Sequence, residues 1–260
     1  MKIYAHRGFS ARYPENTEIA FREALKYGCD GIETDVQLTR DGVPVIIHDE
    51  TVKRTALNSK ARVVDLTYEE ILGLDFSAFR PGYYSPQRIL TLSQLLQLVK
   101  DSKKDISLNL ELKNSVVSYP GLEEIILKEV KPFEDSIDFL FSSFNHESIR
   151  RLNGLQSGLK TAPLVSRQIP DLPAYVNDLG SKGIHPAQNI LTRRILSDLL
   201  SNDLFVNIYT VNSLEMARIY KELNVSGIFT DRCLEMKEEL SYGKKPGPDQ
   251  ARWRKTKSDR

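Results

Sequence analysis

Two short segments of the chain carry an imidazole and two carboxylates that a β-hairpin would bring together. The first segment contains Glu33 and Asp35, and the second contains His48. An Arg-Asp-Gly sequence flanked by apolar residues lies between them, and this pattern is a strong signal for a hairpin turn. Glu33 and Asp35 are two residues apart, so their side chains face the same side of a strand. An imidazole beside two carboxylates predicts a metal site with an adjacent acid or base.

The register of this hairpin decides which carboxylate the histidine approaches. A turn centred between Asp41 and the residue before it places His48 opposite Glu33. A turn centred between Asp41 and the residue after it places His48 opposite Asp35. The sequence leaves both registers open, and in either case we expect the second arm to deliver His48 rather than to form a strand of the main sheet.

Short apolar strand candidates alternate with amphipathic helical patterns along almost the whole chain. This alternation predicts a (β/α)8 TIM-type barrel, and we expect residues 1–240 to form one catalytic barrel domain. We expect Asn16 to begin the helix that ends near Tyr27, and Asn212 to begin a later helix, because asparagine is a preferred N-cap residue. The eight strand candidates are Ile3–His6, Gly31–Val36, Ser107–Lys113, Phe139–Phe144, Thr161–Val165, Gly183–Ala187, Val206–Val211 and Gly227–Asp231.

Two stretches do not fit the alternation. Residues 50–90 are rich in aromatic side chains and predict a segment inserted after the second strand, on the face formed by the carboxyl ends of the strands. The alternative is a surface excursion that is packed by its own aromatics. Residues 241–260 are basic and almost without apolar side chains, so we expect a disordered, solvated tail. Weak binding of this tail to a membrane surface through Trp253 is the alternative.

The bulk composition limits the possible partners and the compartment. The net charge is +1, so no overall field favours nucleic acid or an anionic membrane. No apolar run approaches the roughly 20 residues of a membrane span, and no secretory signal is present, so we expect no stable membrane insertion. The only cysteines, Cys29 and Cys233, indicate a reducing compartment, which we take to be the cytoplasm. We expect them at opposite ends of the barrel and therefore unpaired.

Polar residues at the carboxyl ends of the predicted strands would converge on one face of such a barrel. Burying these charges without partners is costly. A cation bound by the carboxylates would remove part of that cost, and an anionic substrate would satisfy the arginine and the lysine. The residues concerned are His6, Arg7, Glu33, Asp35, His48, Glu111 and Lys113.

These residues stand in a set of motifs that resembles the glycerophosphodiester phosphodiesterase family. The motifs keep the family order between about residues 3 and 235. The resemblance implies a TIM-type barrel with an insertion after the second strand, and cleavage of small glycerophosphodiesters to glycerol 3-phosphate and an alcohol. The motifs are His6-Arg7-Gly8, Pro14-Glu15-Asn16-Thr17, Glu33-Thr34-Asp35-Val36, Thr39-Arg40-Asp41-Gly42, His48-Asp49, Glu111-Leu112-Lys113, Ser143-Phe144 and Gly227-Ile228-Phe229-Thr230-Asp231.

The resemblance also implies roles for individual residues. It implies one divalent metal held by Glu33, Asp35 and Glu111, with His6 and His48 as general base and acid. Carboxylate ligands suit hard cations, so we expect Mg²⁺, Ca²⁺ or Mn²⁺. We favour His6 as the base and His48 as the acid. The nucleophile is either water or the 2-hydroxyl of the substrate glycerol, and the sequence does not choose between these routes.

Substrate contacts and competing functions complete the expectation. Arg7 and Lys113 would bind the phosphate, and Tyr209 would form an aromatic wall for the glycerol, where the family often has tryptophan. One alternative is a lysophospholipase D, in which the aromatics of residues 50–90 line a channel for an acyl chain. An alternative of another class is a catalytically inactive barrel that binds phosphate ligands.

Overall fold

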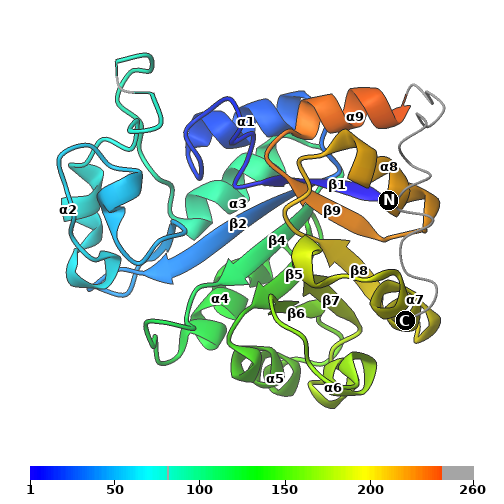
Figure 1. Ribbon diagram of the computed structural model, residues 1–260. Helices are drawn as coiled ribbons and strands as arrows, with labels where there is room; N and C mark the ends of the chain where they lie inside the picture. Colours follow the sequence, from blue (N-terminus) through cyan, green and yellow to red (C-terminus); the bar gives the residue numbers. More distant parts are fainter. Residues whose placement is uncertain (81, 242–260) are drawn as a thin grey trace.

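The fold is a closed barrel of parallel strands surrounded by helices, in a computed structural model that describes residues 1–80 and 82–241 (Figure 1). The strands follow the order β1-β9-β8-β7-β6-β5-β4-β2, and pairing of β1 with β2 closes the barrel. This architecture confirms the predicted (β/α)8 fold. Of the predicted tail, only residue 241 lies within the described residues. The barrel strands are β1 Lys2–His6, β2 Gly31–Leu38, β4 Ser107–Leu112, β5 Asp138–Ser143, β6 Thr161–Val165, β7 Gly183–Pro186, β8 Phe205–Ile208 and β9 Gly227–Thr230.

Helices cover the outside of the barrel and bury one apolar face each against the strands. In α3, for example, Leu92, Leu95 and Leu96 are fully buried, and a capping box formed by Thr91 and Gln94 fixes where the helix begins. The helices around the barrel are α1 Glu18–Lys26, α3 Leu92–Asp101, α4 Leu122–Val130, α5 His146–Leu155, α6 Leu172–Asp178, α7 Arg193–Ser201, α8 Leu214–Glu222 and α9 Cys233–Ser241, with short 3₁₀ turns at η3 Lys131–Phe133 and η4 Gln188–Ile190.

The short strand β3, Pro44–Ile46, pairs antiparallel with the end of β2 and lies outside the barrel. Both predicted hairpin registers are wrong, because the turn is centred on Asp41 itself. The registered pairs end at Val36 with Ile46, and the same register carried two residues further would place His48 opposite Thr34, midway between the two expected partners. The reason is a three-residue loop in which Gly42 adopts φ +79°, a conformation that glycine adopts without steric cost.

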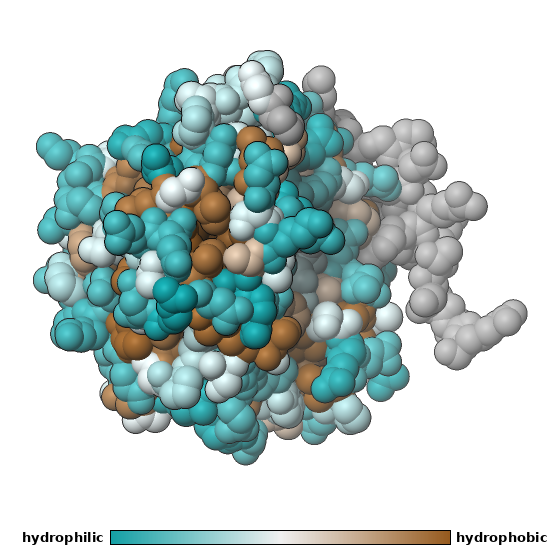
Figure 2. All heavy atoms as spheres, turned by 90° about the vertical axis from the view of Figure 1, so that its left-hand side faces the viewer, coloured by the Kyte–Doolittle hydropathy of each residue, from teal (hydrophilic) through white to brown (hydrophobic). Residues whose placement is uncertain are grey.

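The insertion predicted between the second strand and its helix follows β3, at the left of Figure 1, and contains η1 Val52–Arg54, η2 Val63–Asp65 and α2 Tyr68–Leu72. It has a small apolar cluster of its own, so it packs as a unit beside the barrel. On this side of the molecule, apolar surface is surrounded and divided by hydrophilic side chains (Figure 2). The buried cluster consists of Val45, Ile47, Val52, Ala56, Val63, Ile71, Phe76 and Ile89.

The expectation that the two cysteines lie at opposite ends of the barrel is wrong. Both thiols are free and buried, and a hydrogen bond with Cys233 together with burial raises the pKa of the Cys29 thiol. They meet because α9, which begins at Cys233, packs against β1, and its Lys237 Nζ lies 2.6 Å from Oδ1 of Asp30, the residue after Cys29. Among the described residues, no helix has the length and apolar character needed to cross a membrane.

One histidine lies fully buried inside the barrel. His185 of β7 packs its ring 4.8 Å from that of Phe229, and its Nε2 lies 3.2 Å from Asn207 Nδ2. The amide nitrogen of Asn207 donates this hydrogen bond, so Nε2 accepts it and the ring is neutral. Burial lowers the pKa of His185 to about 3, since nothing charged compensates for desolvation of an imidazolium.

This buried histidine predicts a loss of stability in mild acid. The unfolded chain binds a proton at His185 near pH 6.5, whereas the folded protein does not until about pH 3. The stabilisation is therefore complete above pH 6.5 and is lost as the pH falls from 6.5 to 3. We expect His185→Gln to remove about 2 kcal/mol of the wild-type difference in unfolding free energy between pH 7 and pH 5. Urea unfolding at both pH values measures it, and an unchanged difference would contradict the assignment.

Candidate active site

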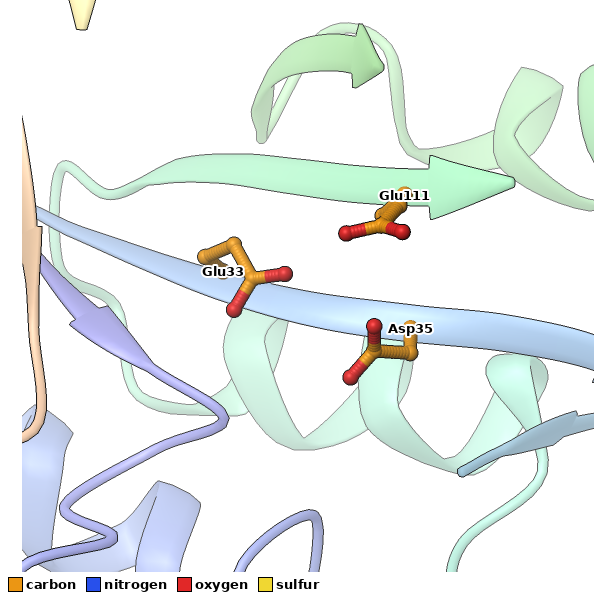
Figure 3. A group of neighbouring side chains, drawn as sticks. All are labelled: Glu33, Asp35 and Glu111. Carbon is orange, nitrogen blue, oxygen red and sulfur yellow. The ribbon is translucent and has the colours of Figure 1, made fainter. Parts of the chain in front are cut away.

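Three carboxylates meet at the mouth of the barrel (Figure 3). Glu33 and Asp35 lie two residues apart on β2, and Glu111 on β4 is the register partner of Asp35. One oxygen from each carboxylate lies within 4.8 Å of the others, and all three residues are buried. Period-two alternation on one strand and parallel pairing with the next are therefore sufficient to bring the group together.

The electrostatics of this triad do not balance without a cation. Burial and the charge of Asp35 raise the pKa values of both Glu33 and Glu111. Burial also opposes ionisation of Asp35, but Arg7 and His48 hold its pKa below the ordinary range. Asp35 Oδ1 is buried without a hydrogen-bond partner. An all-oxygen donor set with a free buried oxygen fits a hard divalent cation, so these three residues could hold one.

Asp35 is held in place by a residue that we expected to act only as a helix cap. Asn16 Nδ2 donates to Asp35 Oδ2 at 3.0 Å, and Asn16 Oδ1 accepts from the Thr34 hydroxyl at 2.9 Å. The N-cap of α1 is Thr17, so the predicted capping role of Asn16 is wrong. Asn16 has φ +56°, a conformation that asparagine tolerates better than most residues, and this turn directs its amide to β2.

His6, the last residue of β1, is oriented by a carboxylate. His6 Nδ1 lies 2.6 Å from Asp231 Oδ1, and Nε2 lies 3.9 Å from Glu33 Oε2. Burial opposes protonation, but Glu33 and Asp231 raise the pKa of His6. The hydrogen bond from His6 lowers the pKa of Asp231 to about 2 against the effect of burial. Asp231 is thus an anion that fixes a proton on Nδ1 and leaves Nε2 for chemistry.

Asn212 supports this pair rather than capping a helix as predicted. Its Nδ2 donates to Asp231 Oδ2 at 2.6 Å, and its Oδ1 accepts from the Asp231 backbone at 3.0 Å. The cap of α8 is Ser213, whose hydroxyl accepts from the Met216 amide at 3.4 Å. Because Ser213 caps the helix, the side chain of Asn212 is available for its contact with Asp231.

His48 reaches the site because the chain bends after β3. Gln37 Nε2 donates to the carbonyls of three successive residues, Ile47, His48 and Asp49, at 3.0, 3.1 and 2.8 Å. Gln37 Oε1 in turn accepts from the Tyr119 hydroxyl at 3.0 Å. His48 Nδ1 lies 2.6 Å from Asp49 Oδ1, so this histidine also has a carboxylate behind it.

The two cations at the site are already engaged with carboxylates. Arg7 Nη1 donates to Glu15 Oε1 at 3.0 Å, and Arg7 Nε lies 3.5 Å from Asp35 Oδ2. Lys113 Nζ donates to Glu111 Oε1 at 2.8 Å. Burial disfavours their charged forms, but the neighbouring carboxylates raise the pKa of both residues, so both are cations. They partly neutralise the triad.

A cavity of about 210 Å³ opens between these groups. Tyr209 forms part of its wall, edge-to-face with Phe144 at a centroid distance of 6.0 Å. Four buried polar atoms of the lining have no hydrogen-bond partner: Arg7 Nε, Tyr209 Oη, Asn109 Oδ1 and His185 Nδ1. The predicted site residues that line the cavity are His6, Arg7, Glu33, His48, Glu111 and Tyr209.

Comparison with known proteins gives one consistent result. The family model described as "Glycerophosphoryl diester phosphodiesterase family" matches residues 6–235. A glycerophosphodiester phosphodiesterase of Bacillus altitudinis is 39% identical, over 92% of this chain and 99% of its own. One from Caldanaerobacter subterraneus subsp. tengcongensis is 37% identical, over 88% of this chain and 93% of its own. A solved phosphodiesterase of Oleispira antarctica, in complex with the product sn-glycerol-3-phosphate, superposes with a TM-score of 0.83 at 26% identity, covering 93% of this chain and 97% of that one.

The acidic triad predicts that the protein binds a divalent cation, and this binding can be measured without substrate turnover. We expect Asp35→Asn to weaken Mn²⁺ binding by about 10- to 100-fold in calorimetric titrations, because it removes one of the three carboxylate charges that would bind the cation. Glu124→Gln is the matched control, since Glu124 lies in the first turn of α4 and outside the triad. Equal affinities for Asp35→Asn and Glu124→Gln would show that the triad does not hold the metal.

Proposed function

The chain belongs to the glycerophosphoryl diester phosphodiesterase family, and from this membership we propose that it hydrolyses glycerophosphodiesters to glycerol 3-phosphate and an alcohol. The observation that carries the proposal is the presence of two carboxylate-backed histidines, His6 and His48, in the cavity lined by Glu33 and Glu111. A catalytically inactive barrel would be expected to lack at least one of these groups.

Glu33, Asp35 and Glu111 would hold the metal, for which Mg²⁺, Ca²⁺ and Mn²⁺ are the candidates by donor chemistry. When bound, the cation supplies positive charge that stabilises the negative charge developing on the phosphate oxygens. Arg7 and Lys113 add two further positive charges beside the triad. The phosphodiester anion would therefore be attracted to the position where the two histidines can act on it.

We assign His6 as the general base and His48 as the general acid. Asp231 and Asp49 each accept from Nδ1 of their histidine, which leaves Nε2 to exchange a proton with the substrate. His6 Nε2 lies 3.9 Å from Glu33 Oε2 and so stands next to the metal position, which suits activation of the nucleophile. His48, which follows the outer hairpin strand β3, would protonate the departing alcohol. Either water or the glycerol 2-hydroxyl can be the nucleophile in this scheme. Formation of a cyclic phosphate would show that the 2-hydroxyl attacks.

The unpaired polar atoms of the cavity support a substrate that carries hydroxyl groups. Tyr209 Oη, Asn109 Oδ1 and His185 Nδ1 need partners when buried, and a polyol supplies donors and acceptors for all three. Asn207 occupies Nε2 of His185, so Nδ1 carries the hydrogen and donates. We propose that glycerol lies against these atoms, with the aromatic ring of Tyr209 as its wall.

A lysophospholipase D activity is the second candidate, because of a larger cavity next to the site. This cavity of about 540 Å³ shares His6 and Arg7 with the site and is also lined by Phe76 and Phe79 of the insertion. Phe79 is 45% exposed and could contact an acyl chain. Release of choline from a lysolipid, compared with release of glycerol 3-phosphate from glycerophosphocholine, separates the two activities.

Residues 1–240 are proposed to carry the whole activity, and the tail from residue 241 is not needed in this scheme. The cytoplasmic location of the protein is a prediction from the sequence.

The proposed histidine roles predict large losses of turnover without unfolding. We expect His6→Ala and His48→Ala each to lower kcat by about 100-fold or more, since general acid and base catalysis contribute on that scale. Formation of glycerol 3-phosphate from several glycerophosphodiesters, with added Mg²⁺, Ca²⁺ or Mn²⁺ and with EDTA, is the measurement.

His146→Gln is the matched control, because His146 does not line this cavity and is hydrogen-bonded to Tyr175 and to the Leu164 carbonyl. We expect this control to keep wild-type turnover. Near wild-type rates in either alanine variant would reject that histidine's role. Full activity after thorough chelation would reject the metal, and substrate binding without hydrolysis would favour the inactive barrel.

A further inference from the structure

An arginine of the insertion joins the two halves of the site. Arg54, at the end of η1, binds two carboxylates at once. Its Nε donates to Asp49 Oδ2 at 2.7 Å and its Nη2 to Asp49 Oδ1 at 2.9 Å. Nη1 and Nη2 donate to Glu15 Oε2 and Oε1 at 2.5 and 2.8 Å. Both contacts are bidentate, and the planar fork of arginine is suited to that geometry.

Each of these carboxylates has a second partner inside the site. Asp49 Oδ1 lies 2.6 Å from His48 Nδ1, and Glu15 Oε1 accepts from Arg7 Nη1 at 3.0 Å. A continuous chain of charged hydrogen bonds therefore runs from the histidine on the hairpin arm to the arginine after β1. Arg54 is its central member, although it lines only the larger cavity and not the smaller one lined by Glu33 and Glu111.

We propose that Arg54 is a positioning residue that holds His48 and Arg7 in their working orientations through Asp49 and Glu15. This inference rests on the proposed function for its kinetic consequence, but the geometry stands without it. Against burial, the hydrogen bonds of Arg54 help to hold the pKa values of Asp49 and Glu15 below the ordinary range, so both are anions. Without Arg54, these two anions would face each other across the gap that it fills.

The insertion fixes the base of Arg54 firmly. Val52, two residues earlier, is fully buried in the apolar cluster of the insertion, and its backbone pairs with Ala61 at 3.0 Å. The Thr55 amide closes the turn on the Val52 carbonyl at 3.2 Å. The Arg54 side chain itself is 47% exposed, so burial of the arginine is not what it contributes. A half-exposed ion pair adds little to stability, which leaves orientation as the principal effect.

The alternative is a tie that only attaches the insertion to the barrel. Arg40 offers a matched control for this alternative, because it also connects the two parts. Arg40 Nη2 donates to Glu70 Oε2 at 3.2 Å and Nη1 to the Asp65 carbonyl at 2.9 Å, both in the insertion and away from the histidines. Arg54→Gln and Arg40→Gln both remove a half-exposed guanidinium bound to at least one carboxylate, and only Arg54 is linked to the site.

The kinetic test separates the two arms of Arg54. We expect Arg54→Gln to lower kcat by about 10- to 100-fold and to raise KM, with a melting temperature equal to that of Arg40→Gln. Asp49→Asn should reproduce the loss in kcat, and Glu15→Gln should chiefly raise KM. The double variant of Arg54 and Asp49 should have the same kcat as Asp49→Asn alone, since both act through one histidine. Arg54→Lys should be intermediate, because an ammonium cannot bind both carboxylates bidentately.

A spectroscopic test does not depend on turnover. The chain has four histidines, so ¹⁵N-histidine spectra can be assigned with single variants. We expect His48 to be protonated at Nδ1 in the wild type and to populate both tautomers in Arg54→Gln, while Arg40→Gln matches the wild type. If the wild-type protein hydrolysed none of the substrates, the proposed function would be overturned, but the tautomer measurement would still test the role of Arg54. An unchanged tautomer, a kcat within two-fold of Arg40→Gln, or multiplicative losses in the double variant would overturn the role of Arg54.

Discussion

The density of negative charge at the mouth of the barrel is the constraint from which the other features of the site follow. Glu33, Asp35 and Glu111 are buried within 4.8 Å of one another, and Coulomb repulsion at that distance in a poorly solvated site is severe. Arg7 and Lys113 neutralise part of it, but their pairing with these carboxylates leaves an excess. A divalent cation would remove the excess, and in the proposed function the same positive charges would then face a phosphate. The arrangement that destabilises the metal-free site is the one that would bind the substrate anion.

A second layer of polar residues makes this charge arrangement usable. Asp231 and Asp49 each bind Nδ1 of one histidine, and each also accepts from a donor on its far side. Those donors come from distant parts of the chain: Asn212 from the loop after β8, and Arg54 from the insertion. Both histidines therefore have a carboxylate at Nδ1, but these carboxylates are supported by different elements of the fold. One depends on the barrel, and the other depends on a segment added to it.

The sequence predicted the barrel and the shared face of Glu33 and Asp35 because these signals are local, whereas Glu111 was assigned to the same metal site through the family resemblance. Strand alternation places Glu33 beside Asp35, and apolar periodicity locates the strands to within one or two residues at most ends. It failed where a side chain has a choice between a local and a distant partner. Asn16 and Asn212 carry the composition of helix caps, yet Thr17 and Ser213 occupy the N-cap positions. Only Ser213 caps with its hydroxyl, because the Thr17 hydroxyl donates to the Pro14 carbonyl at 2.6 Å. The serine after Asn212 is a signal that could have been read.

The hairpin shows the limit of register arguments more directly. Pairing rules allow a two-residue turn on either side of Asp41, but the three-residue loop with Gly42 at positive φ lies between them. That register alone would turn His48 towards the face of Thr34, away from the carboxylates. The chain corrects this through Gln37, which faces three successive carbonyls and bends the arm after Ile46. The backbone path at the histidine is therefore supported by one buried amide, and period-two alternation cannot supply it. A barrel can recruit an acid or base from outside its strands in this way, provided that a polar side chain within the barrel satisfies the backbone of the bend.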